Sequence, residues 1–403
     1  MRQGLNRIDR VGAVVVAIAA YGLVAPFAIF RANRIVQGEG RSLLDALPSW
    51  LAIALMAIVV IGIGIALLRT PVPIRLVTSL VLIATLVIAI GKAATFLTPQ
   101  GNSYARVSPG SGFWMLGAAF ALMATDSLAR MRPGAWTRIA FLLAIAAAST
   151  LVLMSDLWND LSIMKEYAAR ADTFWTEAGR HVTLALGSLG VAALIGIPLG
   201  IVSHRVEPLR ATILNSLNIV QTIPSIALFG ILIGPLSWIA ANIPGSAEAG
   251  IRGIGTAPAL VALFLYSLLP MVANTVGGLA GVPRGANDAA RGVGMTDRQR
   301  LVQVELPLAL PVILTGIRIV LVQNIGLATI AALIGGGGFG VFVFQGLGQT
   351  AMDLVLLGAV PTVVLAFAAA VILDAMVELT APANLAPAKT APGATAGSKE
   401  AIP

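Results

Sequence analysis

The stretch GVPRGANDAARGVGMTDRQRLVQVELPLALP, residues 281–311, is a polar interval between two strongly apolar segments of this chain. Proline favours helix starts and breaks helix interiors, so Pro283 and Pro307 are expected to bracket a structure separate from its neighbours. Small residues inside the brackets would allow another protein surface to approach closely. The pattern predicts a short helix near residues 285–293, a turn at Gly294 and a second helical stretch over residues 297–305.

The chain around this interval is too apolar for an ordinary water-soluble domain. Apolar residues make up 58% of the 403 residues, charged residues 11%, and the mean hydropathy is +0.91. A bilayer core of ~30 Å needs roughly 20 apolar residues of helix. The composition therefore predicts an all-α polytopic membrane protein. We expect about ten spanning helices, near residues 11–30, 50–68, 76–97, 111–129, 139–155, 181–202, 211–233, 257–279, 308–333 and 354–379.

The distribution of arginine and lysine sets the orientation, because cationic loops remain on the cytoplasmic side. With the N-terminus inside, the inside segments hold about twice as many basic residues as the outside loops. This bias predicts a multi-pass protein of the bacterial inner membrane with both termini in the cytoplasm. Arg31, Arg34 and Arg41 are exceptions, since they lie together in a predicted outside loop.

Several classes of function are disfavoured by what the chain contains. It has no cysteine and two histidines, His181 and His204, so we expect neither a disulfide framework nor a metal centre. The net charge of +8 suits anionic lipid headgroups, so we expect contact with the lipid bilayer and no nucleic-acid partner. The phosphate-binding pattern G-x4-G-K-[ST] is absent from the sequence, so we expect no cofactor in this chain.

The chain divides into unlike parts. Residues 1–155 hold five predicted helices with short loops and no chemical motif, whereas residues 181–380 have longer loops with ordered patterns of Gly, Pro and charge. Between them, residues 156–180 mix charged and aromatic side chains, which is typical of an interfacial periplasmic segment. Residues 381–403 are rich in Ala, Pro, Lys and Thr, a composition that predicts a disordered cytoplasmic tail.

The polar interval carries a spaced pattern, D-A-A-x3-G-x9-V-x-L-P. It resembles the EAA loop, E-A-A-x3-G-x9-I-x-L-P, of the permeases of ATP-binding-cassette importers, and departs from it at Asp288 and Val304. The alternative, an ordinary solvated inside loop, does not account for the long-range spacing. The resemblance implies that the loop at 283–307 couples the chain to a separate ATPase through a short helix. The implied coupling residues are Asp288, Ala289, Ala290, Gly294, Val304, Leu306 and Pro307.

Three further stretches, at 174–201, 215–233 and 316–340, look like permeases of osmoprotectant importers for glycine betaine, carnitine and choline. The five N-terminal helices resemble one branch of that group. The resemblance implies a type I permease core preceded by five accessory helices, with glycine betaine or a related quaternary-ammonium compound as solute. It also implies three partners: a cytoplasmic ATPase that holds ATP and magnesium, a periplasmic solute-binding protein, and a second permease subunit, either a shorter paralogue or a second copy.

Polar groups at membrane depth mark a candidate passage. Such groups are costly in lipid unless they face a protein seam or a wet cavity. The stretch around Pro224 is expected to line the passage or its gate, with a simple packing kink as the alternative, and Arg318 could instead snorkel towards the cytoplasm. The glycine-rich run 335–340 is expected to form a flexible outer turn that contacts a binding protein. The candidate passage residues are Gln221, Thr222, Pro224, Ser225, Arg318, Gln323 and Asn324.

Other functions remain open on the sequence. The permease could carry another small solute such as an amino acid. An ion-coupled secondary carrier would need ionisable groups near the bilayer centre, yet Asp126, Asp374 and Glu378 fall near the predicted inside ends of helices. An intramembrane hydrolase would need a positioned nucleophile and base, and neither histidine accompanies a G-x-S-x-G pattern. We therefore expect a transport subunit without enzymatic activity of its own.

Overall fold

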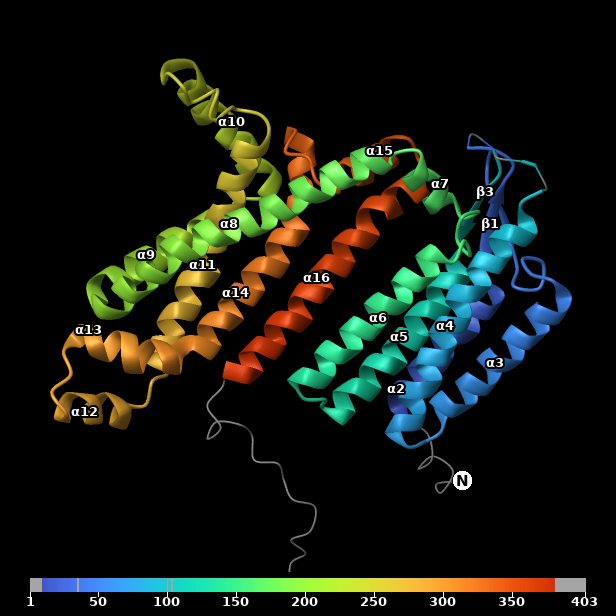
Figure 1. Ribbon diagram of the computed structural model, residues 1–403, viewed down its shortest axis with the longest axis horizontal. Coiled ribbons are helices and arrows are strands. Elements are labelled where there is room, and N and C mark those ends of the chain that lie inside the picture. Colours follow the sequence, from blue (N-terminus) through green and yellow to red (C-terminus); the bar gives the residue numbers. More distant parts are fainter. Residues whose placement is uncertain (1–8, 35, 100, 103, 381–403) are drawn as a thin grey trace, which may run out of the picture.

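The structure is a computed structural model that describes residues 9–34, 36–99, 101–102 and 104–380. Figure 1 shows two predominantly helical bodies side by side, joined by the short helix α7 (Ser162–Ala168). The predicted tail at 381–403 lies outside the described residues. In the described part, nine helices are long and apolar enough to cross a membrane, and α2 is a shorter apolar helix. The expected helical membrane architecture is thus confirmed, although the helices differ in detail from the expected ten.

The N-terminal body packs four of its five helices around one apolar core. Val15, Leu55, Leu86 and Phe120, one from each of these helices, are almost completely buried in it. The fifth helix, α6, has no buried residue except Ala135, and it lies against the other body. The helices are α2 (Arg10–Val24), α3 (Ser49–Leu67), α4 (Val72–Leu97), α5 (Ser111–Met131) and α6 (Ala135–Met154).

A small antiparallel sheet caps this body, which the all-α expectation did not include. Its strands are β1 (Ala28–Arg31), β2 (Glu39–Arg41) and β3 (Arg106–Pro109), in the order β2-β1-β3. The predicted span at 11–30 is wrong at its end, because α2 stops at Val24 and residues 28–30 belong to β1. Pro26 disfavours a longer helix, and the next amide, Phe27 N, donates to Arg41 O at 2.8 Å.

The second body is built around α11 (Thr256–Ala280), which contacts α8, α9, α10 and α14. Apolar side chains from these elements, among them Leu184, Phe229, Leu263 and Ala328, form its core. The helix α16 packs on α14 and faces α6 of the first body. The remaining elements are α8 (Ala171–Arg205), α9 (Glu207–Thr222), α10 (Ser225–Asn242), α12 (Arg284–Gly292), α13 (Asp297–Arg300), the π-helix η1 (Leu301–Glu305), α14 (Leu306–Ala328), the 3-10 helix η2 (Ile330–Ile334), α15 (Gly340–Gly348) and α16 (Met352–Thr380).

Two predicted segments have different boundaries in the structure. The span expected at 211–233 is divided into α9 and α10 at Ile223 and Pro224, since Pro224 has no N–H to continue the helix. The expected interfacial segment at 156–180 contains the separate helix α7, but its last ten residues already belong to the long helix α8.

The molecule has two distinct ends. The helix α12, the end of α16 and the start of α2 lie along the lower edge of the molecule in Figure 1, which we call the α12 end. The sheet, α7 and α15 lie at the opposite end, which we call the sheet end.

Candidate functional site

The polar interval forms two short helices that meet at Gly294. Helix α12 ends at Gly292, Gly294 has a φ of +80°, and α13 starts after Thr296. A left-handed residue at the end of a helix favours glycine, and no neighbouring atom would contact an added Cβ there. Thr296 and Gln299 form a capping box, in which Thr296 N donates to Gln299 Oε1 at 2.9 Å. The turn is therefore set by backbone conformation rather than by crowding.

The predicted coupling residues divide between the surface and the interior of this loop. Asp288, Ala289 and Gly294 are exposed, whereas Ala290 is buried against the chain's own atoms. Val304 and Leu306 are half-buried, and Pro307 is exposed in the first turn of α14. The exposed side of α12 is thus accessible to another protein, and Ala290 packs the opposite side of the helix against the rest of the chain.

The loop continues into α14 without a break. The π-helix η1 joins α13 to α14, so one helical segment runs from Asp297 to Ala328. A π-turn widens a helix locally, and here it occurs where Pro307 removes a backbone donor. Movement of α12 would therefore be transmitted to a spanning helix.

A buried charge cluster fixes the loop to α8. Glu305 and Arg300 are 3% and 5% exposed, and Arg300 Nε donates to Glu305 Oε1 at 3.1 Å. Glu305 also accepts from Arg205 at the end of α8, and Arg300 pairs with Asp297 at 2.8 Å. A buried carboxylate is stable only when it is paired in this way. Sequence reasoning missed these residues, because the pairing between Arg205 and Glu305 spans 100 positions and leaves no local pattern.

The predicted passage residues of α9 and α10 lie at a helix break. Thr222 and Pro224 are exposed, and Ser225 is half-exposed. Gln221 faces the interior, where its Nε2 donates to the carbonyl oxygen of Tyr266 at 2.8 Å. The hydroxyl of Tyr266 in turn donates to the carbonyl oxygen of Ile223. Two hydrogen bonds to Tyr266 therefore fix the break to α11, while Thr222 and Pro224 on its other side are exposed.

The predicted passage residues of α14 lie elsewhere, in seams between helices. Asn324 is completely buried, and its Nδ2 donates at 2.9 Å to the hydroxyls of Ser188 in α8 and Ser267 in α11. Arg318 forms an ion pair with Asp374 of α16, and Gln323 is half-buried. Among the described residues, none of these three has a hydrogen bond or ion pair with the residues at the break, although Asn324 is bonded to Ser267, which follows Tyr266 in α11.

The glycine-rich run is packed, in contrast to the expected flexible turn. Gly338 N donates to Glu177 Oε2 at 2.6 Å, and Phe339 N donates to His181 Nδ1 at 3.3 Å. Glu177 and His181 are buried residues of α8. Gly338 has a φ of +85°, which glycine adopts most readily. The turn is thus held against α8 at the sheet end by these two hydrogen bonds.

The N-terminal body holds α16 near both of its ends. Near the sheet end, Arg31 of β1 pairs with Asp353 at 3.7 Å. Near the α12 end, Arg138 of α6 pairs with both Asp374 and Glu378, and Ala135 N donates to Glu378 Oε1 at 3.2 Å. All three acidic residues of α16 are therefore bound by arginines of the first body.

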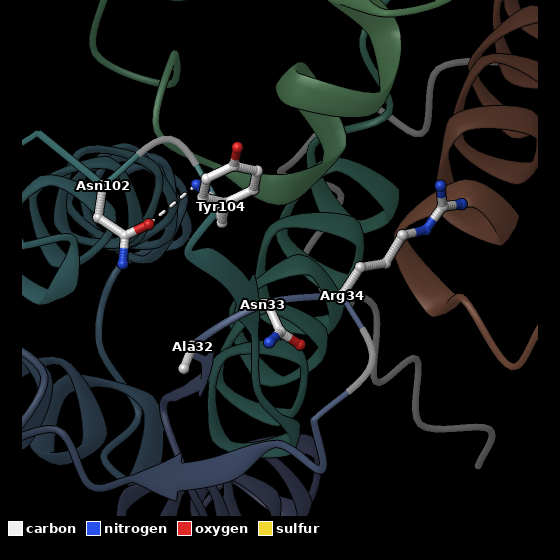
Figure 2. A pocket seen from close by; sticks show the side chains of 5 residues that line it. All are labelled: Ala32, Asn33, Arg34, Asn102 and Tyr104. Carbon is white, nitrogen blue, oxygen red and sulfur yellow. Dashed lines mark hydrogen bonds between the residues drawn. The ribbon is translucent and has the colours of Figure 1, made fainter.

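A shallow hollow lies among the loops of the N-terminal body. Ala32, Asn33, Arg34, Asn102 and Tyr104 line it (Figure 2). Asn102 Oδ1 accepts a hydrogen bond from Tyr104 N at 2.9 Å, which closes the loop on itself. Arg34 extends towards the second body, where its NH2 donates to Gln349 Oε1 at 3.1 Å. The hollow is at the opposite end of the molecule from α12.

Two family models match the chain. Residues 9–164 match the model described as "ABC transporter permease YehY, N-terminal domain". Residues 192–384 match the model described as "Binding-protein-dependent transport system inner membrane component". The two matches fall on the two bodies of the structure.

Curated relatives match about half of the chain and most of their own length. The chain is 43% identical over 187 residues to the osmoprotectant import permease protein OsmW of Salmonella typhimurium, covering 46% of this chain and 82% of OsmW. It is 37% identical over 205 residues to the choline transport system permease protein OpuBB of Bacillus subtilis, covering 51% of this chain and 87% of OpuBB.

Another relative is the glycine betaine/carnitine/choline transport system permease protein OpuCB of Bacillus subtilis, 35% identical over 204 residues, with 51% of this chain and 85% of OpuCB covered. Among solved structures, an inward-facing MetNI methionine ABC transporter matches with 22% identity and a TM-score of 0.47, covering 53% of this chain and 99% of that chain.

Proposed function

The chain belongs to the permease family of binding-protein-dependent ATP-binding-cassette importers, and on this basis we propose that it carries a quaternary-ammonium osmoprotectant such as glycine betaine, choline or carnitine. The solute assignment is supported by three relatives that are each at least 35% identical and whose names specify these compounds or osmoprotectants in general. An amino acid as solute has less support, because these relatives do not carry that description.

The observation that carries the mechanism is the continuity of α12, α13, η1 and α14. We propose that the exposed side of α12, with Asp288 and Ala289, enters a cleft of a separate cytoplasmic ATPase, which holds ATP and magnesium. Asp288 lies exposed in the middle of α12, so it would meet the ATPase directly. Closure of the ATPases would then move α14 through the continuous helix, with Glu305 holding the loop to α8.

A permease of this family works with an ATPase, a solute-binding protein and in general a second permease subunit. We propose that the α12 end faces the cytoplasm of a bacterial cell and that both termini lie on that side of the inner membrane. The binding protein would then dock at the sheet end. Residues 1–155 would be an accessory domain and residues 181–380 the permease core. The second permease would be a shorter paralogue or a second copy, and the passage would form between the two.

Reconstitution tests this function. The chain is placed in proteoliposomes with its ATPase and second permease, and uptake of radiolabelled glycine betaine is followed with the binding protein outside. Uptake should require ATP inside and should be reduced by excess choline or carnitine. Uptake that continues without ATP and stops when the proton gradient is collapsed would contradict the proposal, and so would competition by amino acids alone.

A further inference from the structure

The helix α9 has a mainly polar outward face, on which Ile219 is the one large apolar residue at 65% exposure, and its other apolar residues from Ile213 to Val220 are half-buried. Asn215, Asn218 and Thr222 are exposed, and their spacing of three and four residues places them on one face. Leu217 and Val220, on the opposite side, are half-buried, and Val220 packs on the core of the second body. A helix that faces lipid has the reverse arrangement, with apolar residues outward.

This polar face lies at membrane depth. Gln221 is bonded to Tyr266, which lies near the middle of the 25-residue helix α11. Each helical residue rises ~1.5 Å, so Asn218 and Asn215 lie ~4.5 Å and ~9 Å from Gln221 towards the α12 end. Half of a bilayer core is ~15 Å thick, so both amides are within it.

The two amides have no internal partner. Among the described residues, neither the Asn215 nor the Asn218 side chain makes a hydrogen bond, whereas buried Asn324 uses both of its polar atoms. An amide that faces lipid would lose its hydrogen bonds to water without replacement. The outward face of α9 must therefore meet water, a solute or another protein.

We propose that the outward face of α9 lines the water-filled translocation passage and that Asn215 and Asn218 bind the solute transiently as it passes. The proposal rests on the proposed function, since it takes the solute to be a small quaternary-ammonium compound. The amide N–H groups would donate to the carboxylate or hydroxyl of the solute, and the amide oxygens would face its cationic head.

The absence of charge on this face suits transport. No residue from Ala211 to Thr222 is ionisable. A fixed carboxylate would hold a cationic head strongly and delay release, whereas neutral amides bind weakly and let the solute leave. Selection of the solute would then be left to the binding protein.

Single cysteines test the proposal directly, because the natural chain contains no cysteine. Asn215→Cys, Asn218→Cys and Thr222→Cys are each assembled with ATPase, second permease and binding protein in proteoliposomes. The probe is trimethylammonioethyl methanethiosulfonate, which carries the same trimethylammonium head as choline. Matched controls are Leu217→Cys, on the inward face of α9, and Ile61→Cys, an exposed apolar position within α3.

The three α9 thiols should react at least about tenfold faster than both controls in one nucleotide state, because a thiolate forms only where water can solvate it. Saturating glycine betaine with its binding protein should slow that reaction. Reaction no faster than at Ile61→Cys would place the face in lipid and overturn the proposal. Cross-linking to the second permease with no labelling in any nucleotide state would place it in a protein seam and also overturn it, as would rapid labelling that solute leaves unchanged.

The uptake assay separates this result from the function itself. The cysteine-free complex is tested first for ATP-dependent glycine betaine uptake. If it imports a different solute and that solute protects the α9 thiols, the osmoprotectant assignment is refuted while the passage stands. If glycine betaine is imported and the α9 thiols remain unreactive, the passage is refuted while the function stands.

Discussion

Gln221 and Tyr266 are joined by a hydrogen bond that compensates for a proline. Pro270 has no N–H with which to bond the carbonyl oxygen of Tyr266 four residues earlier, and Gln221 Nε2 occupies that oxygen at 2.8 Å. The hydroxyl of Tyr266 then satisfies Ile223 at the break between α9 and α10. The side chain of Gln221, next to the break between α9 and α10, therefore satisfies a carbonyl left free by Pro270 in α11. The side chain of Tyr266 in α11 satisfies a carbonyl at the break.

Replacement of Gln221 by Leu should weaken this junction. The Tyr266 carbonyl would lose its partner at membrane depth, and an unsatisfied buried group costs about 1–3 kcal/mol. Thermal unfolding in detergent should shift downward, and Tyr266→Phe, which frees the Ile223 carbonyl, should do the same. Thr222→Val is the matched control, because the Thr222 hydroxyl bonds only within its own helix. An unchanged melting temperature for Gln221→Leu would contradict the role given to this bond.

Replacement of Gly294 by Val should prevent the loop at 283–307 from coupling the permease to the ATPase. A β-branched residue at a φ of +80° is strained by roughly 1–2 kcal/mol or more, so α12 would change direction. Uptake should be lost and the ATPase should co-purify poorly, while membrane insertion stays normal. Gly285→Ala is the control, since Gly285 lies within α12, where an added methyl meets no atom. If the Gly294 variant transported normally, α12 would not be the coupling element.

Replacement of Glu305 by Ala should detach the loop from α8. Arg300 would lose its buried carboxylate partner and keep only the exposed Asp297, and breaking a buried ion pair from one side costs up to about 3–5 kcal/mol. The loss of stability is measured by unfolding of the purified subunit. The loss of coupling is measured by solute-stimulated ATP hydrolysis. The double variant Arg300→Met with Glu305→Leu should recover part of the stability, because it removes both buried charges and the partners that remain, Arg205 and Asp297, can reach water. Additive losses in the double variant would show that the two residues act independently.

Replacement of Arg138 by Ala should loosen the α12 end of α16 without unfolding the chain. The Arg138 ion pairs are only partly buried, and pairs that water can reach contribute about 0–1 kcal/mol each, so the melting temperature should change little. Spin labels at Trp136→Cys and Met376→Cys should report a broader distance distribution between α6 and α16. Arg132→Ala is the control, because Arg132 lies at the same end and the described residues give it no ion-pair partner. An unaltered distribution would mean that the ion pairs of Arg138 do not hold α16 at this end.

The sequence predicted the features that depend on local chemistry. Apolar length located most spanning helices, and the spacing around Gly294 predicted the two short helices and their turn. It did not predict the sheet, because β1 has four residues and pairs with β3 across more than seventy positions. It likewise missed Arg300 and Glu305, whose link to α8 is a long-range contact.

The apparent exceptions to the charge rule have a structural reason. Arg31 in β1, Arg41 in β2 and Arg34 between these strands lie at the sheet end, which the proposed orientation puts outside the cell, whereas arginines are usually retained on the cytoplasmic side. Each pairs with a carboxylate: Arg31 with Asp353, Arg34 with Glu166, and Arg41 with Glu39. Counting basic residues could not detect this, because two of the three partners are more than one hundred positions away.

The unbroken helix from Asp297 to Ala328 makes the two ends of the permease mechanically dependent. Its 32 residues form a rod about 48 Å long. One end is joined to α12 through the turn at Gly294. Beyond the other end lies the glycine-rich turn that Glu177 and His181 hold against α8. If an ATPase displaces the first end, as proposed, movement of this rod would either carry α8 along or break the bonds of Gly338 and Phe339 to Glu177 and His181, so the sheet end would change by release of a contact rather than by gradual bending.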